Sequence, residues 1–119
     1  MTKKILVIDD DPVTVGLLSS RLKANQYDVS MAGDGAEGLV KLKEEKPDLI
    51  ILDVAMPKMD GYTFVQEFKK VTQLDKTPII MLTSRDQMKD LFTMEGIKDY
   101  VVKPFNIEEL LKKIRGYLK

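Results

Sequence analysis

Neither cysteine nor histidine occurs in this chain of 119 residues, and tryptophan is absent as well. The lack of cysteine excludes disulfides, thiolate metal sites and a cysteine nucleophile. The lack of histidine excludes Ser-His-Asp catalysis and histidine-bound metals, so any bound metal must be held by oxygen atoms. The apolar runs are too short to span a bilayer, and Met1-Thr2-Lys3-Lys4 leads straight into a strand-like run. We therefore expect neither a signal peptide nor a membrane anchor.

Charge of the two signs is balanced in this chain. It has 19 basic and 19 acidic side chains and a pI near 6.3, so it has no overall field that would hold nucleic acid or an anionic membrane. Apolar residues make up 44% of the chain and charged residues 32%, enough to fill and to coat one core. We predict a single domain, residues 1–119, that binds neither nucleic acid nor membrane directly.

Short apolar runs alternate with segments of helical period along the chain. Strands are predicted at residues 5–8, 27–31, 49–52, 78–82 and 100–102. Continuous apolar runs are typical of strands buried on both faces, whereas the alternating run 27–31 is typical of an edge strand. Five strands alternating with helices predict an α/β fold with a doubly wound parallel sheet and helices on both faces. The alternation alone leaves the strand order open.

The helices between these runs have marked starts. The expected N-caps are Asp11, Asp34 and Asn106. In the second helix we expect Ala36 and Val40 to share the apolar face beside Leu39 and Leu42. The segment 87–95 gives the weakest helical pattern of the chain.

The segment Gly33-Asp34-Gly35-Ala36-Glu37-Gly38 matches the pattern of dinucleotide-binding loops. However, Asp34 and Glu37 would place two negative charges where a pyrophosphate should lie, at a helix N-terminus that attracts anions. The segment also follows the second predicted strand rather than the first. A turn with a helix cap is the favoured interpretation, and nucleotide binding is the alternative.

Polar residues follow four of the predicted strands, and the carboxyl ends of parallel strands share one edge of a sheet. They are Asp9, Asp10 and Asp11 after the first strand, Asp53 after the third, Thr83 after the fourth and Lys103 after the fifth. Two carboxylates about 4 Å apart repel each other by about 4 kcal/mol at an effective dielectric constant of about 20. They need a proton, Lys103 or a cation, and Mg²⁺ is the natural cation for oxygen ligands. The alternatives are that Thr83 caps a helix and that Lys103 is a solvated lysine.

These residues occur within four motifs. The motifs are Asp9-Asp10, Asp53 with Met56-Pro57-Lys58-Met59-Asp60-Gly61 after it, Thr83, and Tyr100-Val101-Val102-Lys103-Pro104-Phe105. With this order and spacing, the chain resembles the CheY-like receiver domain of two-component response regulators over essentially its full length. The resemblance implies a flavodoxin-like sheet of order 2-1-3-4-5 and a cis bond between Lys103 and Pro104.

The resemblance also implies a magnesium site. Asp10 and Asp53 would bind Mg²⁺ directly, together with the backbone carbonyl of Ala55. Asp9 would act mainly through a bound water. The cofactor expected for this chain is therefore Mg²⁺.

The remaining roles concern the phosphoryl group. Asp53 would accept it from a phosphohistidine and form an aspartyl phosphate, Lys103 would pair with one phosphoryl oxygen, and Thr83 would hydrogen-bond another. Tyr100 would be the switch residue, turning inward as Thr83 moves. Phosphoryl transfer requires in-line positioning and neutralisation of the phosphoryl oxygens, which these groups supply.

The expected partners follow from the same resemblance. They are a sensor histidine kinase or a phosphotransfer protein, an output partner that the sequence does not identify, and a second copy of the chain in a phosphorylation-linked homodimer. The protein would be a cytoplasmic signalling switch, and not an enzyme beyond its own phosphorylation and dephosphorylation.

Two other classes of function stay open at this point. One is a receiver-fold interaction module that binds its partner without being phosphorylated. The other is an enzyme, either a Mg²⁺-dependent phosphatase with an aspartyl nucleophile or a flavin or nicotinamide protein of similar architecture. Such a phosphatase normally has a second acid two residues after its nucleophile, where this chain has Ala55.

Overall fold

The computed structural model describes residues 2–53, 63, 64, 66, 67, 77–83 and 97–118. Its elements are β1 (Lys4–Ile8), α1 (Pro12–Ala24), β2 (Asp28–Ala32), α2 (Gly35–Glu45), β3 (Leu49–Asp53), β4 (Ile79–Thr83), β5 (Ile97–Val102) and α5 (Ile107–Tyr117). The helix predicted at 87–95 lies outside the described residues, as does Ala55. Among the described residues, no helix has both the length and the apolar content that crossing a bilayer requires.

The five strands form one parallel sheet of order β2-β1-β3-β4-β5, which confirms the predicted fold class and strand order. β2 lies at one edge, as its alternating sequence predicted. β5 lies at the other edge, as the implied order 2-1-3-4-5 placed it, whereas its apolar run 100–102 alone predicted a strand buried on both faces. Of those three residues only Val101 is buried, because an edge strand has one neighbour and less cover.

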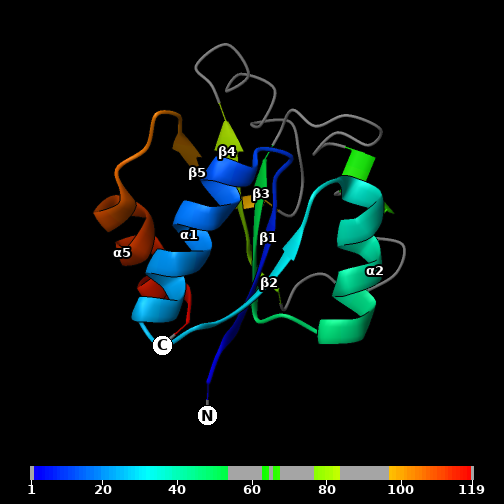
Figure 1. Cartoon of the computed structure of the whole chain (residues 1–119), viewed down its shortest axis with the longest axis horizontal. Helices are drawn as coiled ribbons and strands as arrows, with labels where there is room; N and C mark the ends of the chain where they lie inside the picture. The colour runs from blue at the N-terminus through cyan, green and yellow to red at the C-terminus, as the bar shows by residue number, and fades with distance from the viewer. Residues whose placement is uncertain (1, 54–62, 65, 68–76, 84–96, 119) are drawn as a thin grey trace.

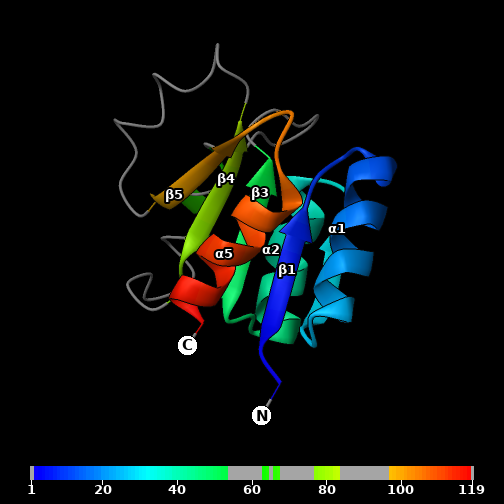
Figure 2. The same ribbon diagram turned by 90° about the vertical axis from the view of Figure 1, so that its left-hand side faces the viewer.

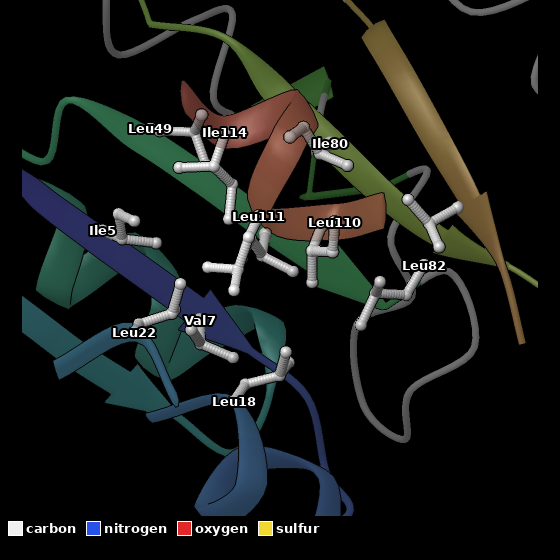
Figure 3. Packing of buried hydrophobic residues seen from close by; sticks show 12 residues of the cluster. Ile5, Val7, Leu18, Leu22, Leu49, Ile80, Leu82, Leu110, Leu111 and Ile114 are labelled. Carbon is white, nitrogen blue, oxygen red and sulfur yellow. The ribbon is translucent and has the colours of Figure 1, made fainter. Parts of the chain in front are cut away.

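Helices cover both faces of the sheet, α1 and α5 on one and α2 on the other (Figures 1 and 2). Figure 3 shows how strand side chains meet α1 and α5 on their common face. Those labelled are Ile5, Val7, Leu49, Ile80 and Leu82 of the strands, Leu18 and Leu22 of α1, and Leu110, Leu111 and Ile114 of α5. Burial of each such side chain contributes about 1.5–3 kcal/mol, so this packing fixes the strand ends relative to one another.

The buried face of α2 matches the predicted one only in part, since Leu42 is buried and Leu39 packs half-buried against the core, as expected. Ala36 is exposed and Val40 is 54% exposed, whereas Gly35, Gly38 and Leu42 are buried. The helix lies so close to β1 that a Cβ atom at Gly38 would be 2.6 Å from Ile8 Cδ1. A glycine therefore forms the contact face, which a search for large apolar residues overlooks.

The expected helix caps are confirmed. Asp34 accepts a hydrogen bond from the Glu37 N–H at 2.8 Å, and Asn106 caps α5 in the same way. Asp11 accepts from the Val13 N–H at 3.0 Å and from the Thr14 hydroxyl at 2.8 Å, and these bonds hold the Asp11 pKa below its ordinary value. The glycine-rich segment at 33–38 thus serves helix capping and close packing, which favours the turn interpretation over nucleotide binding.

Candidate functional site: an acidic cluster at the carboxyl edge

Two neighbouring strands bring aspartates to the carboxyl edge of the sheet. Asp9 and Asp10 follow β1, and Asp53 is the last residue of β3, which pairs with β1. The Asp9 N–H donates to the Ala32 carbonyl of β2 at 3.1 Å, and a carboxylate oxygen of Asp9 accepts the Asp11 N–H at 3.0 Å. The Asp9 backbone and side chain are thereby both held at this edge.

The aspartates at this edge lie close together. One carboxylate oxygen from each of Asp9, Asp10 and Asp53 lies within 4.8 Å of those of the other two. Asp9 is 1% exposed and Asp53 is 6% exposed, whereas Asp10 is open to solvent. The acidic cluster, defined here as these three residues, therefore has a buried floor and one solvated side.

Lys103 joins the acidic cluster from the segment after β5. Its Nζ lies 3.4 Å from Asp53 Oδ1 and 3.5 Å from Asp9 Oδ2. The Lys103 N–H donates to the Thr83 carbonyl at 2.7 Å, which extends the pairing of β4 with β5 to the edge. The bond between Lys103 and Pro104 is cis, as the family resemblance implied.

The charges of the acidic cluster are not balanced by Lys103 alone. Burial and the neighbouring Asp9 charge raise the pKa of Asp53 from 3.8 to about 6, although Lys103 works against this shift. One ammonium thus faces two buried carboxylates that share it, with Asp10 beside them. The arrangement favours binding of additional positive charge.

The donor set fits a hard divalent cation. Every side-chain donor in the acidic cluster is a carboxylate oxygen, and Mg²⁺ is commonly bound through one or two carboxylates while retaining several waters. The solvated side at Asp10 leaves room for those waters. Asp9, Asp10 and Asp53 are the residues that could hold the ion.

The other predicted residues lie near this edge but in different settings. Thr83 ends β4 and is fully buried, one residue beyond Leu82, the register partner of Asp53. Tyr100 lies within β5 rather than at its carboxyl end, and it packs half-buried against the apolar cluster on the α2 face. The structure therefore brings Asp9, Asp10, Asp53 and Lys103 together, with Thr83 at the same edge and Tyr100 farther back along its strand.

An apolar groove that sequence reasoning missed borders the site. It has a volume of about 380 Å³, and Val13 and Leu17 of α1 line it together with Lys103 and Phe105. Val13 is 77% exposed and Leu17 is 52% exposed. The sequence feature that could have indicated this groove is the pair Val13 and Leu17, two apolar residues four positions apart on the outer face of α1.

Comparisons with known proteins agree with this geometry. Residues 5–115 match the family described as response regulator receiver domain. The chain is 42% identical over 121 residues to the alkaline phosphatase synthesis transcriptional regulatory protein PhoP of Bacillus subtilis, covering 100% of this chain and 50% of that protein. It is 39% identical over 118 residues to the DNA-binding dual master transcriptional regulator RpaA of Synechocystis, covering 98% of this chain and 49% of that one. The chain thus spans about half the length of these curated relatives.

Solved structures give the same result. The chemotaxis response regulator CheY4 of Vibrio cholerae superposes with a TM-score of 0.89 at 35% identity, covering 98% of this chain and 99% of that one. The response regulator protein TrrA of Thermotoga maritima, solved in complex with Mg²⁺ and BeF, superposes with a TM-score of 0.86 at 35% identity, covering 98% and 99%.

Proposed function

This chain belongs to the response regulator receiver domain family, whose members are signalling switches, and from that membership we propose that Asp53 accepts a phosphoryl group in a Mg²⁺-dependent reaction. The receiver domain would span residues 1–119. The convergence of Asp9, Asp10 and Asp53 within 4.8 Å, with Lys103 3.4 Å from Asp53, carries this proposal. A nucleophile, a countercharge and a set of oxygen ligands then share one edge of the sheet.

The reaction is a single displacement at phosphorus. A carboxylate oxygen of Asp53 attacks the phosphorus of a phosphohistidine, and a new P–O bond forms as the P–N bond breaks. The electron pair stays on the imidazole nitrogen, which takes up a proton. Lys103, already 3.4 Å from Asp53, pairs with a phosphoryl oxygen and so keeps the developing charge balanced.

Mg²⁺, when bound, supplies the further positive charge that the phosphoryl oxygens require. Asp9, Asp10 and Asp53 are the residues that would hold it, together with the backbone carbonyl of Ala55. TrrA was solved with Mg²⁺ and BeF bound, and we extend that chemistry to this chain on the basis of its acidic cluster.

Phosphorylation replaces the single negative charge of the Asp53 carboxylate at the end of β3 with about two negative charges on the aspartyl phosphate. Thr83, fully buried at the end of the adjacent β4, is the residue that would hydrogen-bond a phosphoryl oxygen. Tyr100, on β5 beside β4, would turn inward as Thr83 moves. In this proposal, the conformational change that follows phosphorylation is transmitted from Asp53 on β3 through Thr83 on β4 to Tyr100 on the edge strand β5.

The partners in this proposal are a sensor histidine kinase or a phosphotransfer protein as donor, and an output partner as receiver of the signal. A phosphorylation-linked homodimer and a cytoplasmic location are further parts of it. The curated relatives that this chain matches over half their length are transcriptional regulators, so a transcriptional output is the expectation for a longer protein of this kind.

The test is phosphorylation of the purified chain with acetyl phosphate and Mg²⁺, followed by intact-mass measurement. We expect one phosphoryl group per chain, stable in acid and labile in base, and none in the Asp53→Asn variant. Asp28→Asn, which alters an exposed carboxylate on β2, is the matched control and should be phosphorylated like the wild type.

Equal phosphorylation of Asp53→Asn and wild type would contradict the assignment of Asp53. Phosphorylation that proceeds unchanged after chelation of Mg²⁺ would contradict the metal requirement.

A further inference from the structure

A second aspartate–lysine cluster lies on the face of β5 that α5 covers. The Asp99 carboxylate accepts hydrogen bonds from Lys113 Nζ at 3.0 and 3.2 Å and from the Tyr117 hydroxyl at 3.3 Å. It also accepts the N–H of Tyr100 at 2.8 Å. Asp99, Lys113 and Tyr117 are called the β5–α5 latch below, because their side chains connect that strand to that helix.

The latch connects α5 to β5 at Asp99, the residue that precedes Tyr100. Lys113 and Tyr117 lie four positions apart, so they share one face of α5 and reach the same carboxylate. Side chains alternate between the two faces of a strand, which puts Asp99 toward α5 and the Tyr100 ring toward the opposite face. There the ring packs against the apolar cluster that contains Met81, its register partner.

The charges within the latch support a stable connection. Hydrogen bonding to Asp99 raises the pKa of Lys113, and burial together with the Asp99 charge raises the pKa of Tyr117. Both donors thus keep their protons at neutral pH. The Asp99 side chain is 24% exposed and that of Lys113 29% exposed, so solvent only partly screens the pair.

We propose that the β5–α5 latch stabilises the unphosphorylated arrangement of β5 and so opposes the rearrangement of Tyr100. This inference rests on the proposed function, in which Tyr100 moves when Asp53 is modified. The backbone that carries the Tyr100 ring is held by a hydrogen bond to Asp99, and α5 holds Asp99 in turn. A contact that stabilises one of two states raises the free energy needed to reach the other.

The test measures beryllofluoride binding in the presence of Mg²⁺, together with hydrogen exchange of the Tyr100 amide. In Lys113→Met the half-saturating beryllofluoride concentration should fall about two- to fivefold, as expected for loss of a partly screened ion pair. Exchange of the Tyr100 amide should become faster. Tyr117→Phe, which removes only a hydroxyl, should change both readouts in the same direction by less, and Lys113→Arg should restore them.

Glu108→Gln is the matched control, because it breaks the 3.1 Å ion pair of Glu108 with Arg21 of α1 and leaves the latch intact. Its half-saturating beryllofluoride concentration and its Tyr100 amide exchange should equal those of the wild type.

An unchanged or higher half-saturating beryllofluoride concentration in Lys113→Met overturns the inference, and so does an equal fall of that concentration in Glu108→Gln. If the wild type binds no beryllofluoride, or binds it equally after Asp53→Asn, the proposed function fails and the latch proposal with it. Normal wild-type binding with no change in Lys113→Met overturns the latch alone.

Discussion

The acidic cluster with Lys103 and the β5–α5 latch both combine aspartate with lysine, but in different proportions. Lys103 faces two buried carboxylates at 3.4 and 3.5 Å, with Asp10 beside them. In the latch, one carboxylate has an ammonium, a hydroxyl and a backbone N–H. Among the described residues the first set has more negative than positive charge, so the pKa of Asp53 is raised and binding of a cation is favoured. The second set is satisfied, so it connects two elements without needing a ligand.

Removal of Lys103, the cation that the described residues place beside the acidic cluster, should have the largest effect. In Lys103→Met, phosphorylation by acetyl phosphate with Mg²⁺ should slow by about a hundredfold or more, because one preorganised charge at the reacting group is lost. Initial rates from intact-mass measurements test this expectation.

Lys112→Met is the control, because it removes an exposed lysine of α5. A rate for Lys103→Met similar to that of Lys112→Met would show that Lys103 has no part in the reaction.

Removal of one carboxylate from the acidic cluster should stabilise the chain when no metal is present. Folding raises the pKa of Asp53 from 3.8 to about 6, so between these values the folded state binds more protons than the unfolded state. The free energy of unfolding of the wild type should therefore fall as the pH rises through this range. At pH 7, Asp53→Asn should be more stable by about 2 kcal/mol, since Lys103 keeps Asp9 as its partner.

Urea denaturation at pH 7 and below pH 4, with a chelator present, measures this difference. The difference in free energy of unfolding between Asp53→Asn and the wild type should become smaller at the lower pH, where the Asp53 carboxyl of the wild type is protonated. In a separate measurement at pH 7, saturating Mg²⁺ should also make this difference smaller. A variant that is less stable than the wild type at pH 7 would contradict the view that this site lacks positive charge.

Loss of the cation from the latch should have the smallest effect. Lys113→Met should lower the free energy of unfolding by about 1 kcal/mol, because its ion pair with Asp99 is partly screened by solvent. Thermal unfolding at pH 7 measures this loss. Glu108→Gln, which breaks the more exposed pair of Glu108 and Arg21, should lower the free energy of unfolding by less than Lys113→Met does. The reverse order would mean that the latch contributes no more stability than an ordinary surface ion pair.

Much of the acidic cluster could be predicted because parallel strands impose their geometry on the residues that follow them. Once the apolar runs are assigned to one parallel sheet, Asp9 and Asp53 must end at the same edge, whatever the details of packing. Lys103 follows from the same rule, applied to the last strand. The helix caps at Asp11, Asp34 and Asn106 were equally accessible, because a cap depends on residues two or three positions apart.

The missed features depend on how elements approach each other. On α2, Leu39 and Leu42 were placed correctly, but Ala36 and Val40 were wrongly assigned to the buried face. The approach to β1 is set by the missing side chain of Gly38, and Val40 points outward. The latch was missed because Lys113 and Tyr117 look like solvated helix residues until Asp99 is placed opposite them. For β5, the apolar run 100–102 alone predicted burial on both faces, whereas the strand order implied by the family resemblance placed this strand correctly at the sheet edge.

The tight seating of α2 on β1 has a practical consequence for spectroscopy. The inner side of the helix has no space for a methyl group at Gly38, yet Val40, two positions later, is 54% exposed. The chain has no native thiol. A single cysteine introduced at Val40 would therefore react alone with a fluorescent or spin label and carry that probe outward into solvent, without competition from another site.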